Sequence, residues 1–146
     1  MSDFFLNTVL TFDASVRVCV PLIFASMAGL FAERSGVVDI GLEGKLLMSA
    51  FIAASAASVF GSPWLGLIAG MFASAVLAMI HGFASITYKG NQIVSGVAIN
   101  ILASGLTMIL TLAWFKRGGI TPTLQGDERF LSITLPGVDI IDHIPI

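Results

Sequence analysis

The chain has 146 residues, of which 56% are hydrophobic and 11% are charged, whereas about a quarter of the residues in an average globular protein are charged. The net charge of −2 excludes a basic nucleic-acid-binding protein, so we expect no nucleic-acid partner. A single cysteine, Cys19, excludes a disulfide framework and a cysteine-based zinc site. This composition indicates an all-α, polytopic integral membrane protein that is embedded in a lipid bilayer.

Four apolar segments are long enough to be membrane helices, since about 20 apolar residues cross the hydrocarbon core. They comprise residues 14–32, 44–60, 64–88 and 92–115. Asp, Glu, Lys and Arg are absent from Leu46 to Tyr88 and again from Gly90 to Phe115. The connections at 61–63 and 89–91 are short and contain Gly or Pro. We therefore expect segments two to four to be antiparallel neighbours in space.

The third segment carries small residues at unbroken four-residue spacing, which places them along one face of a helix. They are Gly66, Gly70, Ser74, Ala78 and Gly82. Small side chains let helices approach closely in lipid, where no hydrophobic force drives helices together. We predict that this face packs against another helix.

Two polar residues within the spans need an explanation. The Asn100 amide is costly in hydrocarbon unless it is hydrogen-bonded, so Asn100 either bonds a neighbouring helix or lines a polar pathway. His81 lies near the end of the third segment, and we expect an ordinary histidine at the membrane interface. No cluster of His, Asp and Glu has the spacing of a metal site, so we expect no metal and no cofactor.

The stretch between the first two segments, residues 33–45, is unusual for a loop. It holds five charged residues, yet it is too apolar for a solvated linker. Its glycines, Gly36, Gly41 and Gly44, permit positive φ and close backbone approach. One interpretation is that the second helix is broken near 33–45, with irregular backbone buried in protein or facing a water-filled cavity. The other is a surface loop with a partly buried amphipathic turn. In either case the negative charge of Glu43 would be stabilised by the positive end of the dipole of the following helix.

The string ERSGVVDIGLEGKLLMSAFIAA, residues 33–54, resembles the signature of permease subunits of bacterial ABC importers. The similar branch handles nucleosides and simple sugars and is related to the ribose and branched-chain amino-acid permeases. The resemblance continues through QIVSGVAINILASGLT, in which Gly96 and Asn100 match the family's SG-x-x-x-N pattern, and reaches ITLPGVDIIDHIPI at residue 146. That last stretch is similar to an external loop of the family, so we expect residues 116–146 to form an extracytoplasmic tail.

The resemblance implies a multi-pass protein of the bacterial plasma membrane that has no catalytic residues. Its expected partners are an ABC ATPase subunit and an extracytoplasmic substrate-binding protein. The sequence has no Walker A pattern, so ATP hydrolysis would belong to the separate ATPase. We expect seven residues to line or shape the pathway for a nucleoside or simple sugar. They are Asp39, Glu43, Asn100, Gly36, Gly41, Gly44 and Gly96.

The chain departs from the family in two ways. The family usually has Asn at the position of Asp39 and an apolar residue at that of Lys45, and pairing of Lys45 with Asp39 or Glu43 would compensate. Family members are also roughly twice as long. We therefore expect a permease domain over residues 1–146 that corresponds to the N-terminal half only, with a second permease subunit or the missing C-terminal half as a further partner.

Two other functions remain open from the sequence. One is a non-transporting remnant or accessory membrane protein. The other is a small carrier driven by an ion gradient, which typically has a carboxylate inside a membrane helix. The third and fourth segments contain no Asp or Glu, which disfavours the carrier.

Overall fold

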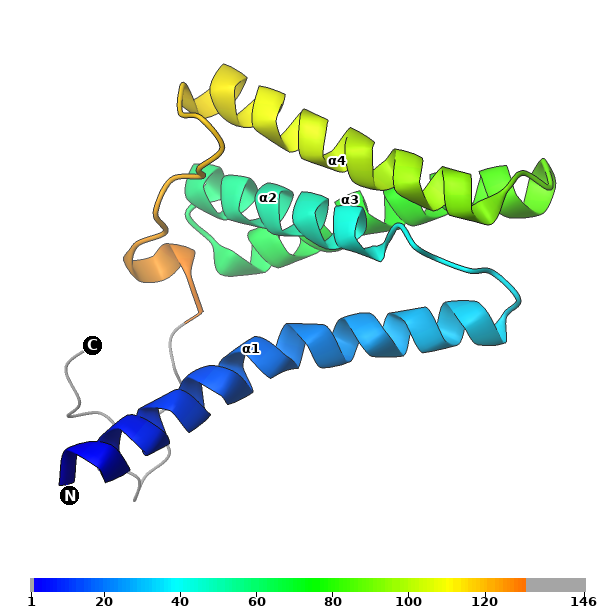
Figure 1. Cartoon of the computed structure of the whole chain (residues 1–146). Coiled ribbons are helices and arrows are strands. Elements are labelled where there is room, and N and C mark those ends of the chain that lie inside the picture. The colour runs from blue at the N-terminus through cyan, green and yellow to red at the C-terminus, as the bar shows by residue number, and fades with distance from the viewer. Residues whose placement is uncertain (1, 131–146) are drawn as a thin grey trace.

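A computed structural model describes residues 2–130 of the chain, and these residues form an all-α fold, as predicted. The long helices are α1 (Ser2–Arg34), α2 (Leu42–Phe60), α3 (Pro63–Gly82) and α4 (Gln92–Phe115). A π-helical turn, η1 (Phe83–Thr87), extends α3, and a 3₁₀ turn, η2 (Gly126–Glu128), follows α4. Four helical stretches are long and apolar enough to cross a membrane. Figure 1 shows that the end of α1, the start of α2, the end of α3 and the start of α4 point toward the same end of the molecule. Of the predicted tail, residues 131–146 lie outside the described part.

Helix α1 begins well before the predicted start of the first span at residue 14. Its first turns continue the apolar sequence, with Phe4, Phe5 and Leu6 exposed. Asp13 and Arg17 are one helical turn apart and form an ion pair with a 2.9 Å N–O distance. In such a pair each charge offsets the other on one face of the helix, so the helix continues through these residues.

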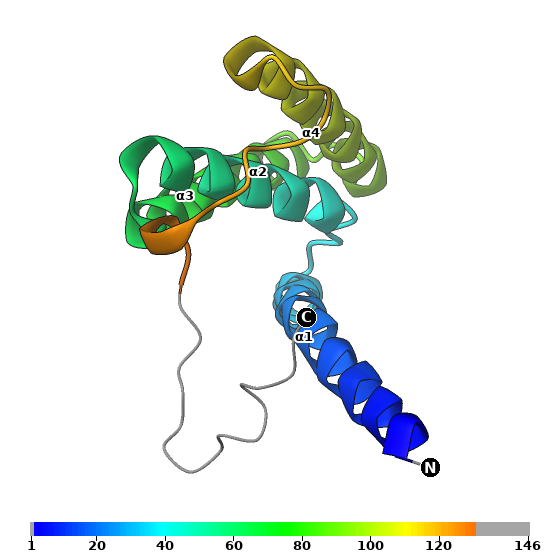
Figure 2. The same ribbon diagram turned by 90° about the vertical axis from the view of Figure 1, so that its left-hand side faces the viewer.

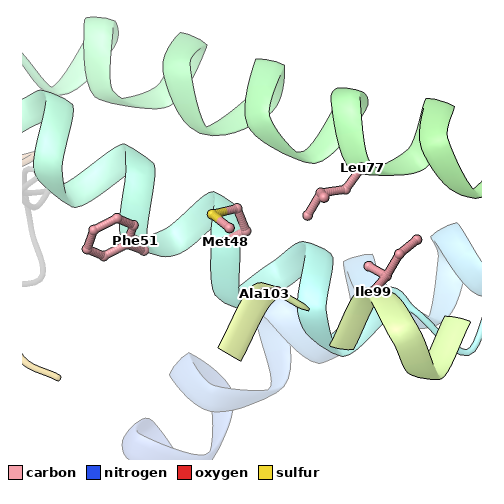
Figure 3. Close-up of a cluster of buried hydrophobic side chains, with 5 residues drawn as sticks. All are labelled: Met48, Phe51, Leu77, Ile99 and Ala103. Carbon is pink, nitrogen blue, oxygen red and sulfur yellow. The ribbon is translucent and has the colours of Figure 1, made fainter. Parts of the chain in front are cut away.

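Helices α2, α3 and α4 form a compact group, and Figure 2 shows α1 standing apart from it. The core of the group is a buried cluster to which all three helices contribute (Figure 3). It consists of Met48, Phe51, Leu77, Ile99 and Ala103. The most hydrophobic window of α1, by contrast, has no residue buried inside the chain. The buried polar side chains of the described residues also lie on these three helices and on η1.

The small-residue face of α3 packs against α2 over its first half only. A Cβ atom placed at Gly66 would lie 2.7 Å from the carbonyl oxygen of Ala53, and one at Gly70 would lie 2.8 Å from that of Ser49. Further along the same face Ser74 is half-buried and Ala78 is exposed. A Cβ atom at Gly82 would have no neighbour within 4 Å among the described residues. The structure thus shows a close helix contact at Gly66 and Gly70.

We predict that Gly70→Ala lowers the thermal stability of the purified protein in detergent. The new methyl group would meet backbone atoms of α2, and overpacking of this kind costs about 1–3 kcal/mol. Gly105→Ala in α4 is the matched control, since a Cβ atom there has open space. Melting curves followed by the loss of monodisperse protein measure the effect. Equal stability of the two variants would contradict the close contact between α2 and α3.

Candidate functional site

The chain between α1 and α2, residues 35–41, is irregular and runs beside the first two turns of α4; we call it the connector. It begins with a turn at Gly36, whose φ of +85° favours glycine. The Val38 N–H then donates to Gln92 Oε1 at 2.7 Å, and Gln92 Nε2 donates to the Gly36 carbonyl at 3.5 Å. The structure matches neither interpretation of residues 33–45 in full, because the connector is bonded to α4 but most of its residues are exposed and only Gly41 is buried. The break lies before α2, which is continuous from Leu42.

Asn100 bonds both the connector and the start of α2. Its Nδ2 donates to the Ile40 carbonyl at 3.1 Å, and its Oδ1 accepts the Gly44 N–H at 2.7 Å. The first N–H groups of a helix have no partner within the helix, and the N-cap residue of α2, Gly41, has no side chain to supply one. Asn100 therefore caps α2 from α4, which confirms that its amide makes an interhelical hydrogen bond.

Three glycines make this approach possible. A Cβ atom at Gly96 would lie 2.9 Å from the Gly41 nitrogen, and one at Gly44 would lie 2.8 Å from both Cα and Oδ1 of Asn100. At Gly41 a Cβ atom would meet the Cα of Gly96 at 3.4 Å. Any larger residue at Gly44 or Gly96 would push the connector away from α4 and break the bonds that Asn100 makes.

Asp39 and Lys45 form an ion pair beside Asn100. Lys45 Nζ donates to Asp39 Oδ2, and the two side chains are only 6% and 11% exposed. The other carboxylate oxygen, Oδ1, accepts the Gly41 N–H at 3.1 Å. Pairing neutralises two charges that would be costly to bury alone. Of the two pairings that would compensate Lys45, the structure shows the one with Asp39, while Glu43 is exposed.

His81 completes the cluster from α3 and is enclosed by protein, a role that the expectation of an ordinary histidine at the membrane interface did not include. The residue is 2% exposed and joins three segments. Its Nε2 lies 3.3 Å from the Val38 carbonyl and 3.9 Å from Asp39 Oδ1, and its Nδ1 lies 3.1 Å from Ser95 Oγ. A carbonyl only accepts, so we assign the proton to Nε2, and Nδ1 then accepts from Ser95. The Ser85 hydroxyl donates to the His81 carbonyl, a bond that joins the π-helical turn to the end of α3.

The structure brings together five of the seven predicted residues: Asp39, Gly41, Gly44, Gly96 and Asn100. Gly36 lies at the turn that starts the connector, and Glu43 has no bond to the cluster. Sequence reasoning missed the contributions of His81, Ser95 and Gln92. The spacing of Gln92, Gly96 and Asn100, four residues apart along one helix face, is a signal that could have included Gln92.

The contacts within the cluster are hydrogen bonds and one compensated ion pair. Among residues 2–130 no group of three or more His, Cys, Asp and Glu side chains is placed to hold a metal ion. What the arrangement does is hold a non-helical stretch of backbone against α4 and the start of α2.

We predict that Asp39→Asn and Lys45→Met are each strongly destabilising, while the double variant recovers most of the loss. Removing one partner leaves the other charge buried and unpaired, at a cost of about 3–5 kcal/mol. Replacing both leaves uncharged side chains of similar size, a change that often leaves the stability of the protein nearly unchanged. The measurement is the melting temperature of the three variants in detergent, with Glu43→Gln as the exposed control. Additive losses in the double variant would show that the pair is not coupled.

Comparison with known proteins places the chain among permeases. Residues 11–135 match the family described as branched-chain amino acid transport system / permease component. The guanosine ABC transporter permease protein NupQ of Bacillus subtilis is 39% identical over 131 residues, which cover 86% of this chain and 40% of NupQ. The nucleoside ABC transporter permease protein NupC of Lactococcus lactis is 34% identical over 132 residues, covering 86% of this chain and 39% of NupC.

A third relative is the putative glucose ABC transporter permease protein TsgC13 of Haloferax volcanii. It is 33% identical over 135 residues, covering 92% of this chain and 39% of that protein. The chain thus spans about two fifths of the length of these relatives. No solved structure gives a significant match. The family match and the four apolar helices confirm the resemblance noted in the sequence. The chain is a multi-pass plasma-membrane protein that belongs to the branched-chain amino acid transport system / permease component family.

Proposed function

We propose that this chain forms part of the translocation pathway of an ABC importer for nucleosides or simple sugars. The observation that carries the proposal is the match of residues 11–135 to a permease family, together with relatives that are named as guanosine, nucleoside and putative glucose ABC transporter permeases. The geometry supports it, because the connector and its polar partners place hydrogen-bonding groups within a group of apolar helices.

The pathway role falls on the residues around the connector. Asn100 and the glycines Gly41, Gly44 and Gly96 shape the backbone, and the Asp39 carboxylate, paired with Lys45, holds the connector in place. Gly36 sets the turn into the connector. Glu43 is exposed on the first turn of α2 and is free to face a polar pathway. Discontinuous membrane helices commonly form substrate sites in transporters because their ends present oriented polar groups.

Transport in this proposal requires further subunits. A separate ABC ATPase supplies the energy, and an extracytoplasmic binding protein delivers the cargo. Since the chain spans about two fifths of its relatives, a second permease subunit or a C-terminal half provides the rest of the pathway. Residues 1–146 then form one membrane permease domain corresponding to the N-terminal half, with residues 116–146 on the extracytoplasmic side.

We predict that Asn100→Leu abolishes uptake of labelled guanosine or glucose while the amount of protein in the membrane is unchanged. Leucine leaves the buried Gly44 N–H without its partner, at about 1–3 kcal/mol, and also removes the bond to the Ile40 carbonyl, and so displaces the connector. Ile101→Leu is the matched control, because Ile101 is the next residue and is 68% exposed.

Uptake is measured in cells that express the whole transporter, with immunoblots for the chain. Wild-type uptake should require ATP and persist when the proton gradient is collapsed, which separates an ABC importer from an ion-driven carrier. Normal uptake by Asn100→Leu would overturn the pathway role. No uptake of any nucleoside or sugar by the wild-type assembly would leave a non-transporting membrane protein.

A further inference from the structure

A cavity of about 510 Å³ lies between α2, α4 and the segment that follows α4. Its size falls in the range of pockets that hold small molecules, about 300–1,000 Å³. It is separate from the connector cluster, since none of its lining residues belongs to that cluster. Its α2 wall is apolar and includes Phe51, which stacks on Trp114.

The opposite wall carries hydroxyl groups. Ser104, Thr107 and Thr111 line the cavity from one face of α4, and Thr121 lines it from the segment after the helix. Ser104 is exposed and Thr121 is half-buried, while Thr107 and Thr111 are buried in the wall. One side of the cavity is therefore polar and the other is apolar.

The α4 hydroxyls are arranged to accept hydrogen bonds from a ligand. Ser104 Oγ donates to the Ile101 carbonyl at 2.9 Å, and Thr107 Oγ1 donates to the Ala103 carbonyl at 2.9 Å. A hydroxyl has one proton to donate and two lone pairs that accept. Because each proton is used within the helix, what the hydroxyls offer to the cavity is acceptor capacity.

This wall continues the polar face of α4 that begins at the connector. Gln92, Gly96, Asn100 and Ser104 follow one another at four-residue spacing, so they lie along one side of the helix. The two earlier side chains with amide groups bond the connector, and Ser104 lies one turn beyond Asn100. The same face thus leads from the connector to the cavity.

We propose that this cavity binds the cargo through its hydroxyl groups and selects nucleosides and sugars over apolar amino acids. This inference rests on the proposed function and names the contact surface. The ribose or sugar O–H groups donate to Ser104 and Thr121, and the apolar α2 wall with Phe51 contacts the base or the sugar face. An amino acid such as leucine has donors only on its ammonium group at one end, so its aliphatic side chain leaves at least one of these acceptors without a partner when it displaces water.

The test uses cysteine accessibility, which the chain favours because Cys19 is its single cysteine. Ser104→Cys and the control Ile109→Cys are each made in a Cys19→Ser parent and expressed with the whole transporter. Ile109 lies on a different face of α4 and is 64% exposed. A membrane-impermeant thiosulfonate reagent is applied to membrane vesicles of both orientations, with guanosine, glucose or leucine as protecting probes.

We expect Ser104→Cys to react at least several-fold faster than Ile109→Cys, because thiols react as thiolates in water. We also expect guanosine or glucose, but not leucine, to slow the reaction. A Ser104→Cys transporter that takes up guanosine or glucose but does not react with the reagent would overturn the proposal, and a further helix filling the cavity would give this result. Protection by leucine equal to that by guanosine or glucose would also overturn it. Loss of all uptake in the parent would instead count against the proposed function.

Ser104→Ala provides a second test that does not depend on the reagent. Loss of one hydrogen bond to cargo should raise the KM for uptake about fivefold with little change in maximal rate. Ser26→Ala is the matched control, since Ser26 Oγ donates to the Ile23 carbonyl of α1 at 2.8 Å with the same spacing in sequence. An unchanged KM for guanosine and glucose in Ser104→Ala would contradict a contact with the cargo.

Discussion

Backbone polar groups inside a membrane must find partners in the protein, because lipid offers none. The connector is a non-helical stretch whose backbone groups find such partners in side chains of α4. Its Val38 N–H and its Gly36 and Ile40 carbonyls bond to the side chains of Gln92 and Asn100. Asn100 lies eight residues after Gln92, which corresponds to about 12 Å along a helix. Helix α2 therefore begins about that far along α4, and the connector occupies the length that α2 does not cover.

The rest of the cluster follows from holding the connector so close. Gly96 and Gly41 allow the two backbones to meet, and Gly44 allows Asn100 to reach the first turn of α2. The close approach also buries Asp39, which then requires Lys45 as a partner. His81 bonds both Val38 and Ser95 and so joins α3 to the same unit. Changes at any of these residues should act through the position of the connector.

Much of this could be predicted because hydrophobic length and small-residue spacing are local properties of a sequence. The four spans, the packing of Gly66 and Gly70 and the hydrogen-bonded state of Asn100 were all evident. The extension of α1 before residue 14 was not predicted, and the ion pair between Asp13 and Arg17 lies within that helix. His81 was missed because its burial depends on the connector folding back 43 residues away in sequence, to Val38. The sequence alone did not show that Glu43 lies on the exposed side of α2, away from the cluster, because charge does not reveal which side of a helix a residue occupies.

The most direct measurement of this account is hydrogen–deuterium exchange at the backbone N–H groups of Val38 and Gly44, with the protein in lipid nanodiscs. The account predicts slow exchange at both, because Gln92 and Asn100 hold these groups in hydrogen bonds. In Asn100→Leu, exchange at Gly44 should become fast while the amides in the middle of α3 stay protected. Fast exchange at Val38 and Gly44 in the wild-type protein would show that the connector is not held against α4 and would contradict the central claim.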